Sequence, residues 1–468
     1  MIFPTLNFLL FFAVVFGASW ALCGWQTARK VFLVGASFFF YMNWNWKFGF
    51  LLAACIVYNW GFGHLIVAAP TPALRKFYVT VAVALNLLTL GFFKYYGFFM
   101  ESLDELLRGI GMARDLPFLD IVLPVGISFF IFQGISYVVD VYRGELKRAH
   151  SLLDVAVFKS FFPQLVAGPI VRAADFMPQL QRPVDPRRIY AGMAFLLILW
   201  GLFKKAIVAN YMSTEIVDKA FLDPGAYGAG DLLLATYAYA VQIYCDFSAY
   251  SDIAIGVAAL LGYHFARNFD QPYRAQSLQD FWRRWHISLS TWLRDYLYIP
   301  LGGNRKGPVR TYANLLITML LGGLWHGAAL KFVFWGFLHG GGLAVERALG
   351  VAPRKRTAWG RVVAIVFIFH FVCLCWIFFR AESFARAIEF LSGFARWRQA
   401  MQLATPFLLV LLAWGIAMHF TPPSLLRRLE GFWSRRNLLW QGLAAGIVVV
   451  LIEAAGSEGV APFIYFQF

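Results

Sequence analysis

Apolar runs of about 17 residues or more recur along the whole length of this chain. Runs of that length are long enough to cross the hydrocarbon core of a bilayer as helices. Only 14% of the residues are charged, which is too few to cover a water-exposed surface. The sequence therefore predicts an all-α, polytopic integral membrane protein with about 11–13 transmembrane helices and additional re-entrant or interfacial helices. The expected spans lie at roughly 3–22, 31–46, 48–69, 77–99, 121–142, 189–210, 231–262, 311–329, 331–349, 361–379, 403–420 and 438–455.

Two stretches are apolar or aromatic without being simple spans. Residues 157–170 contain Pro163 and Pro169, which would break a spanning helix. Residues 278–300 are too aromatic for a loop and too charged for a helix that faces lipid. We expect both to be re-entrant or interfacial. No linker or repeat divides the chain, which predicts one membrane domain over residues 1–468.

The net charge of +16 indicates membrane topology rather than nucleic-acid binding, because Lys and Arg gather in cytoplasmic loops. Their alternation between loops predicts that the N-terminus lies outside and that residues 263–310 lie inside. One loop, 380–402, carries four arginines on the predicted outer side and disagrees with this scheme. It is either an interfacial segment or a sign that the span count is wrong nearby. The cysteines show no metal-ligand spacing, and no metal site is expected.

A polar seam is expected on residues 279–298. If this segment is one helix, Arg283, His286, Ser290 and Arg294 share a face. The arginines fit a helix lying among lipid headgroups as well as they fit a site. His286 has no reason to lie at a headgroup, which favours a role in a site.

Two further histidines lie inside expected spans. His326 follows Trp325 about 24 Å along a helix that starts near residue 310, and glycines at 322, 323 and 327 allow a neighbour to approach closely. An ionisable group in a membrane is a functional candidate, and imidazole exchanges protons near neutral pH. His339 reads as a packing residue.

Asp246 and Asp252 lie within a long apolar helix. An unpaired carboxylate there costs roughly 2.5–3.5 kcal/mol, so both are expected to be ion-paired, with Arg283 or Arg284 as partners. We interpret them as supporting groups rather than as direct participants in chemistry.

Residues 281–290, followed by residues 324–327, resemble the membrane-bound O-acyltransferase family. Within that family the chain resembles the bacterial membrane subunits of alginate O-acetylation. The supporting motifs lie in order along the chain, at Pro124–Phe129, Phe162–Ile170, Asp246–Asp252, Asn268–Tyr273 and Pro462–Phe468.

The resemblance implies a tunnel-forming membrane enzyme in which His326 is the essential histidine and His286 occupies a second polar position. Arg283, Arg284, Ser290, Asp246, Asp252, Trp325 and His339 would then support them. It also implies transfer of acetyl from a cytosolic thioester donor, acetyl-CoA, across the bacterial inner membrane to a periplasmic acetyltransferase partner. Membrane lipids would surround the protein, and no tightly bound cofactor and no nucleic acid are expected. His326 could act as a general base or carry the acetyl group itself.

Two alternatives remain open from the residues. The same His, Asp and Arg groups could form the relay of a proton-coupled transporter or flippase, although no inverted repeat is evident. The acetyl group could also go to peptidoglycan, cellulose or a lipid instead of an exopolysaccharide such as alginate.

Overall fold

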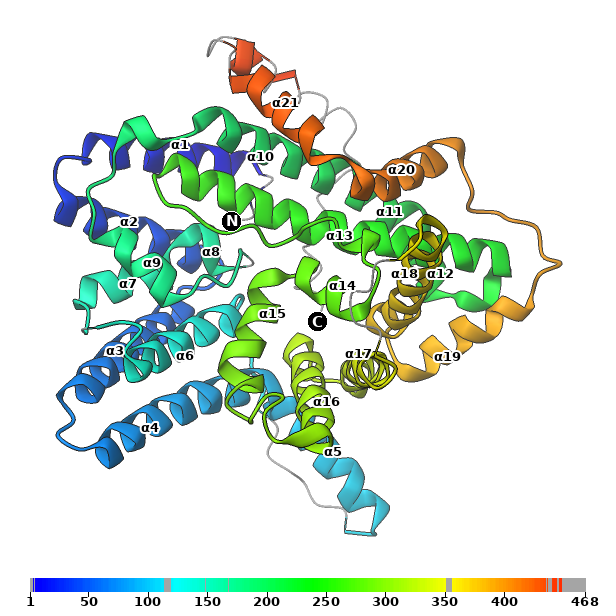
Figure 1. Ribbon diagram of the computed structural model, residues 1–468, viewed down its shortest axis with the longest axis horizontal. Helices are drawn as coiled ribbons and strands as arrows, with labels where there is room; N and C mark the ends of the chain where they lie inside the picture. The colour runs from blue at the N-terminus through cyan, green and yellow to red at the C-terminus, as the bar shows by residue number, and fades with distance from the viewer. Residues whose placement is uncertain are drawn as a thin grey trace. The chain divides into compact units, whose positions relative to one another are not determined.

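The structure is a computed structural model, and the regular secondary structure of its described residues is entirely helical (Figure 1). The described residues are 3, 5–112, 119–147, 149–166, 168–350, 356–434, 436, 440–443 and 446–447. The all-α, polytopic prediction is confirmed. Most of the span expected at 438–455, and the motif at 462–468, lie outside these residues.

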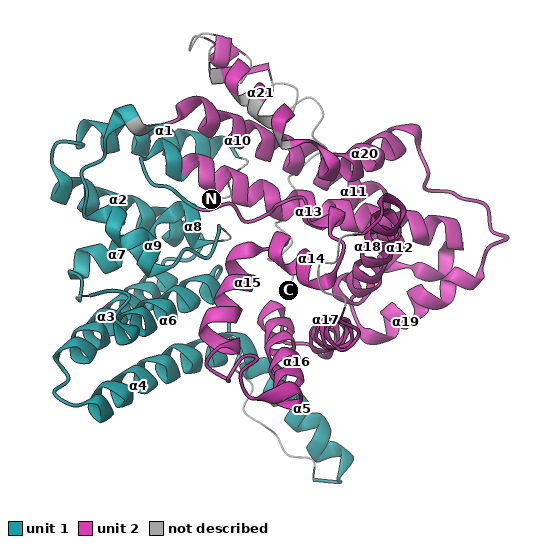
Figure 2. Cartoon of the chain, in the orientation of Figure 1, with its two compact units in different colours: residues 1–189, 258–265 teal, residues 190–257, 266–468 magenta. Residues whose placement is uncertain are grey.

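The chain divides into two compact units (Figure 2). Unit 1 comprises residues 1–189 and 258–265, and unit 2 comprises residues 190–257 and 266–468. The single-domain prediction for residues 1–468 stays a prediction.

Unit 1 holds the N-terminal helices, and α6 lies at its centre. The side chains of α6 are buried along almost its entire length, against α3 and α4. The predicted non-spanning stretch at 157–170 forms two short buried helices, α7 and α8, separated at Phe161, which agrees with the sequence interpretation. The helices of unit 1 are α1 (Leu6–Ala21), α2 (Gln26–Met42), α3 (Lys47–Ala68), α4 (Pro72–Leu90), the π-helix η1 (Gly91–Tyr95), α5 (Tyr96–Gly109), α6 (Ile127–Arg143), α7 (Leu152–Ser160), α8 (Phe162–Leu165), α9 (Ala173–Leu180) and η2 (Pro186–Arg188).

Unit 2 contains all the predicted site residues, arranged on α13 to α17. The helices that lead into this region are α10 (Ala191–Phe203), η3 (Lys204–Ala209), α11 (Asn210–Met212), η4 (Ser213–Val217), α12 (Asp218–Leu222), η5 (Pro224–Ala226) and α13 (Ala229–Leu260). Those that follow are η6 (Pro272–Arg274), α14 (Leu278–Arg284), α15 (Ile287–Leu293), η7 (Arg294–Tyr298), α16 (Gly307–His326), α17 (Leu330–Ala348), α18 (Ala358–Arg380), α19 (Phe384–Ser392), η8 (Gly393–Ala395), α20 (Pro406–Ala417), η9 (Met418–Phe420) and α21 (Pro423–Ser434).

Among the described residues, five helical stretches are long and apolar enough to cross a membrane. Two shorter apolar helices, Leu6–Ala21 and Pro406–Phe420, accompany them. The five stretches are Lys47–Ala68, Pro72–Gly109, Ala191–Leu222, Ala229–Leu260 and Ala358–Arg380.

The arginine-rich loop 380–402 contains the short helix α19, and two of its arginines, Arg380 and Arg396, have partners elsewhere in unit 2. Arg380 pairs with Asp218. Arg396 donates to the carbonyl oxygens of Pro224 and Tyr227, at the two ends of the turn η5. Arginines that hold a turn in this way need not report topology, which explains why this loop disagreed with the charge pattern.

Helices α16 and α17 pack closely as consecutive neighbours (Figure 1). Gly323 of α16 lies against the carbonyl of Phe332, and Gly336 of α17 lies against the carbonyl of Met319, with no room for a Cβ at either position. The expectation that glycines near residue 323 allow close approach of a neighbour is confirmed. This packing positions His326 at the end of α16.

We predict that Gly336→Ala destabilises the protein by about 1–3 kcal/mol, because the added methyl group collides with the backbone of α16. Gly341→Ala is the matched control in the same helix, since a Cβ there meets nothing within 4 Å. The control should be neutral or stabilising by up to about 1 kcal/mol. Unfolding of detergent-purified protein measures both, and equal effects would contradict the packing argument.

Candidate active site

The predicted continuous helix over residues 279–298 is wrong. Helix α14 ends at Arg284, α15 starts at Ile287, and His286 between them has φ 42° and ψ 56°, in the left-handed region. Asn268 supports this break: its carbonyl oxygen accepts from the Ile287 N–H at 2.8 Å, and its side-chain oxygen accepts from the Ser288 N–H at 3.1 Å. Two otherwise unpaired N–H groups at the start of α15 are thereby satisfied.

The break separates the residues of the predicted polar seam. Arg283 is exposed on α14. Arg284 pairs with Asp280 at 2.8 Å and Asp270 at 3.6 Å. The Ser290 hydroxyl donates to the carbonyl of Trp285, just before the break, at 3.1 Å. These residues hold the shape of the segment and do not form one face.

His286 is completely buried. Its Nδ1 lies 3.2 Å from the side-chain oxygen of Asn268, and the Phe247 ring meets it edge-on with 4.5 Å between ring centroids. Helices α14 and α15 have seven residues each, about 10 Å, so this histidine lies outside the spanning segments. Burial lowers the pKa of His286 to about 3, and the imidazole is therefore neutral at physiological pH.

His326 is the last residue of α16, which ends three residues before the span expected at 311–329. It is 4% exposed and is enclosed by aromatic rings, with centroids 4.9 Å from Trp325, 5.1 Å from Trp335 and 5.2 Å from Phe379. The Trp325 ring also lies 6.0 Å from the ring of His286. The structure thus brings the rings of both predicted site histidines close to one tryptophan.

His339 continues this arrangement. Its ring centroid lies 4.7 Å from Trp335 and 5.2 Å from Trp282, and it is fully buried. Imidazole and indole rings therefore alternate from His286 through Trp325, His326 and Trp335 to His339. This geometry agrees with the packing role expected for His339.

The ion pairs of the two aspartates differ from the expected ones. Asp246 pairs with Lys205 at 2.7 Å, and Asp252 pairs with Lys204 at 2.7 Å; neither Arg283 nor Arg284 is the partner. Lys204 also donates to the Ser248 hydroxyl at 2.7 Å. The sequence reasoning overlooked these lysines, although two adjacent cations at the end of an apolar run needed partners as much as the carboxylates did.

The sequence analysis also did not single out Asn268. It lies inside the quoted motif at 268–273, but a lone asparagine gives no sign that it will cap a helix eighteen residues later. The structure shows it buried and bonded to Ser251, His286 and Ser288.

Comparison with known proteins identifies the family. The model of the membrane-bound O-acyltransferase family matches residues 143–384, just over half of the chain. The chain belongs to the membrane-bound O-acyltransferase family. This matched region contains every predicted site residue, from Asp246 to His339, and the protein is an acyltransferase.

Several named proteins are similar in sequence to this membrane-bound O-acyltransferase. It is 40% identical to the probable alginate O-acetylase AlgI of Pseudomonas aeruginosa, covering 90% of this chain and 83% of that protein. The chain is 36% identical to the peptidoglycan O-acetyltransferase of Helicobacter pylori, and the match covers 78% of this chain and 73% of that protein. The chain is 28% identical to the teichoic acid D-alanyltransferase of Bacillus subtilis, and the match covers 56% of this chain and 69% of that protein.

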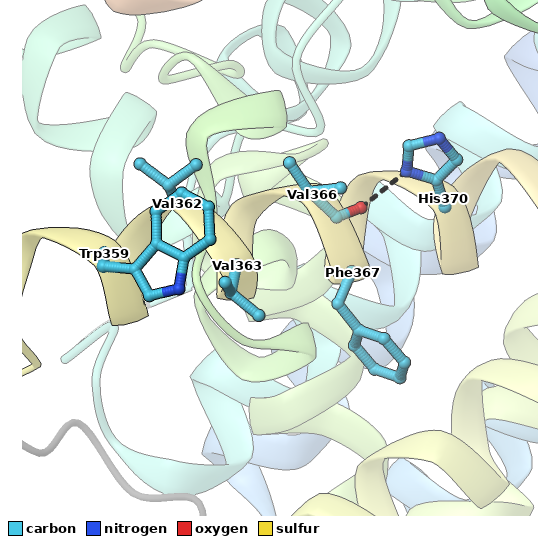
Figure 3. Close-up of a pocket in the computed structure, with 6 residues that line it drawn as sticks. All are labelled: Trp359, Val362, Val363, Val366, Phe367 and His370. Carbon is cyan, nitrogen blue, oxygen red and sulfur yellow. Dashed lines mark hydrogen bonds between the residues drawn. The ribbon is translucent and has the colours of Figure 1, made fainter.

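An apolar groove on α18 of about 540 Å³ is separate from these histidines (Figure 3). One side of the helix lines it, and His370 stands at its end, with Nδ1 donating to the Val366 carbonyl at 2.7 Å and Nε2 accepting from Tyr237 at 2.8 Å. None of the predicted site residues lines this groove.

We predict that Lys205→Met destabilises the protein by about 3–5 kcal/mol, because it leaves the Asp246 carboxylate buried without its cation. The double variant Lys205→Met/Asp246→Leu should lose less stability than the single variant Lys205→Met. The exposed pair Glu215–Lys219 provides the control, since Lys219→Met should change stability by less than about 1 kcal/mol. Denaturant unfolding checks these values, and a double variant that is worse than the single one would contradict the pairing.

We also predict that His286 makes the stability of the protein depend on pH. Its folded pKa of about 3 lies below its ordinary value of 6.5, so between these values only the unfolded state takes up a proton. The contribution of His286 to the free energy of unfolding is fully present above pH 6.5. Below pH 6.5 it falls by about 1.4 kcal/mol per pH unit. His286→Asn, which suits the left-handed backbone, should remove this slope. Unfolding measured at pH 7 and pH 5 would oppose the assignment if both proteins lost stability equally.

Proposed function

We propose that this protein transfers acetyl from a cytosolic thioester donor, acetyl-CoA, across the bacterial inner membrane to a periplasmic acetyltransferase that O-acetylates an exopolysaccharide such as alginate. The observation that carries the proposal is the burial of His326 and His286, both next to the ring of Trp325, inside the family-matched region. The membrane and the acyltransferase class follow from the family. The donor, the partner, the polymer and the periplasmic N-terminus belong to the proposal.

The surroundings of His326 support acyl-transfer chemistry. A histidine can accept the proton of an attacking group or form an acyl intermediate itself. Rings of Trp325, Trp335 and Phe379 keep water from its imidazole, which would limit hydrolysis of a thioester or acyl intermediate. His286, held neutral by burial, is suited to accept a hydrogen bond from the reacting groups.

Exposed cations support a phosphate-bearing donor. Arg305, Lys306 and Arg310 are exposed in the segment between η7 and the first turn of α16. The sequence pattern places this segment on the cytoplasmic side, where cations attract the phosphates of coenzyme A.

The relatives support a polysaccharide pathway and leave one specific alternative. The identity of 40% to an alginate O-acetylase favours an exopolysaccharide. The identity of 36% to a peptidoglycan O-acetyltransferase favours peptidoglycan as the second candidate. Both are O-acetylation reactions, and they favour an enzyme over a proton-coupled transporter or flippase.

We predict that His326→Ala lowers acetyl transfer by about 100-fold or more, the usual contribution of an acid–base or nucleophilic group. The measurement supplies labelled acetyl-CoA to the purified protein in vesicles together with the periplasmic partner. It then follows the label into that partner and into alginate or peptidoglycan fragments.

His370→Gln is the matched control, because His370 lies at the α18 groove away from the site histidines. It should keep transfer near the wild-type rate. Full transfer by His326→Ala would refute the catalytic role of His326. Movement of a solute gradient without movement of label would favour transport, and label in peptidoglycan fragments alone would select the second candidate.

A further inference from the structure

The orientation of the Asn268 side chain is fixed by its neighbours. Its Oδ1 accepts from the Ser288 backbone N–H at 3.1 Å and from the Ser288 hydroxyl at 2.9 Å. A backbone N–H can only donate, so the amide atom that faces it is the oxygen. The amide nitrogen donates on the other side, to the Ser251 hydroxyl at 3.1 Å.

This orientation determines which nitrogen of His286 carries the proton. Nδ1 of His286 lies 3.2 Å from the same Asn268 oxygen. If Nδ1 were unprotonated, its lone pair would face the lone pairs of that oxygen at hydrogen-bond distance. Nδ1 must therefore be the donor, and a neutral imidazole with a proton on Nδ1 has its lone pair on Nε2.

The Ser288 hydroxyl offers the competing arrangement, since it lies 3.4 Å from Nδ1 and could donate to it. Its distance of 2.9 Å to the Asn268 oxygen is shorter, and donation to Nδ1 would restore the repulsion between Nδ1 and that oxygen. The hydroxyl therefore donates to Asn268, together with the histidine.

The other nitrogen of His286 has no partner in the part of the chain that the structure describes. Nε2 is buried and makes no hydrogen bond there. A buried acceptor without a partner is unfavourable by about 1–3 kcal/mol, which is a reason to expect a bound group at this atom. Both the ring and its backbone are fixed, because the Asn268 carbonyl also accepts from the Ile287 N–H at 2.8 Å.

We propose that Asn268 is a positioning residue that holds His286 in the Nδ1-protonated tautomer, so that the Nε2 lone pair accepts a hydrogen bond or a proton from the reacting groups. This inference rests on the proposed acyl transfer for the identity of those groups, but the tautomer itself does not depend on it.

Because the side chain beside His286 is an amide and not a carboxylate, it does not favour the charged form of the imidazole. Charged and titratable groups on the surrounding elements include Asp246 and Asp252 of α13, each paired with a lysine, and His326 of α16. Arg284 of α14 pairs with Asp270 and Asp280, and Arg283 of the same helix is exposed. Burial is the cause of the lowered pKa of His286. A carboxylate in place of Asn268 would stabilise the imidazolium and raise that pKa.

The test is Asn268→Asp, which keeps the size of the side chain and an oxygen facing Ser288 and His286. Protonation of His286 at Nε2 removes its acceptor, so activity should fall as the histidine titrates. We expect the acid limb of the pH–rate profile for acetyl transfer to move to higher pH by about one unit or more. Asn314→Asp is the matched control, a buried asparagine of unit 2 that bonds to the Gly303 carbonyl instead. It should leave the position of the acid limb unchanged.

A second readout is independent of activity. In protein labelled with ¹⁵N-histidine, the signals of His286 are those absent from His286→Asn, and solid-state NMR shows which nitrogen is protonated. We expect the proton on Nδ1 in the wild type, and in Asn268→Asp an imidazolium that appears at higher pH than in the wild type. A proton on Nε2 in the wild type, or an acid limb that shifts equally in Asn314→Asp, would overturn the inference. If the wild type transfers no acetyl at all, the proposed function fails and the NMR result still decides the tautomer.

Discussion

The pairing of polar groups inside an apolar interior is the constraint on which unit 2 depends. Helix α13 carries Asp246 and Asp252, and each carboxylate meets a lysine of η3 at 2.7 Å. Removing Lys205 would leave the Asp246 carboxylate where water cannot reach it, which is more costly than the pair is favourable. The pairs therefore fix η3 against α13, and α13 in turn presents Phe247 and Ser251 to the segment that contains Asn268 and His286.

Polar groups around His286 are also paired, but here the partner is the neutral amide of Asn268. His286 lies at a break that no proline or glycine produces, and the left-handed backbone there persists because Asn268 binds both the main chain and the ring. Aromatic rings provide the remaining contacts, with Trp325 and Trp335 between successive imidazoles. The result is a set of buried imidazoles enclosed by aromatic rings, of which His286 is held neutral by burial.

The sequence predicted the features that depend on composition and local pattern. The long apolar helices, such as α3, α13 and α18, follow from hydropathy, and the family follows from ordered motifs around His286 and His326. It did not predict the break at His286, since residues 279–298 favour helix locally and the interrupting contacts come from Asn268. Nor did it predict the lysine partners, because residues 205 and 246 are brought together only by the packing of two helices. The roles of the site residues stay predictions.

The lysine–aspartate pairs and the Asn268–His286 contact use different side chains, and the contrast suggests why. A carboxylate within an aromatic enclosure would require a cation beside it, and the imidazolium of His286 would supply that cation at the expense of its lone pair. At Asp246 and Asp252 lysines provide the charge, and no lone pair is needed. At His286 an amide fixes the ring through one oxygen and leaves the imidazole neutral. A site that must accept a proton from a substrate is thus better served by asparagine than by aspartate, even though aspartate would hold the ring more tightly.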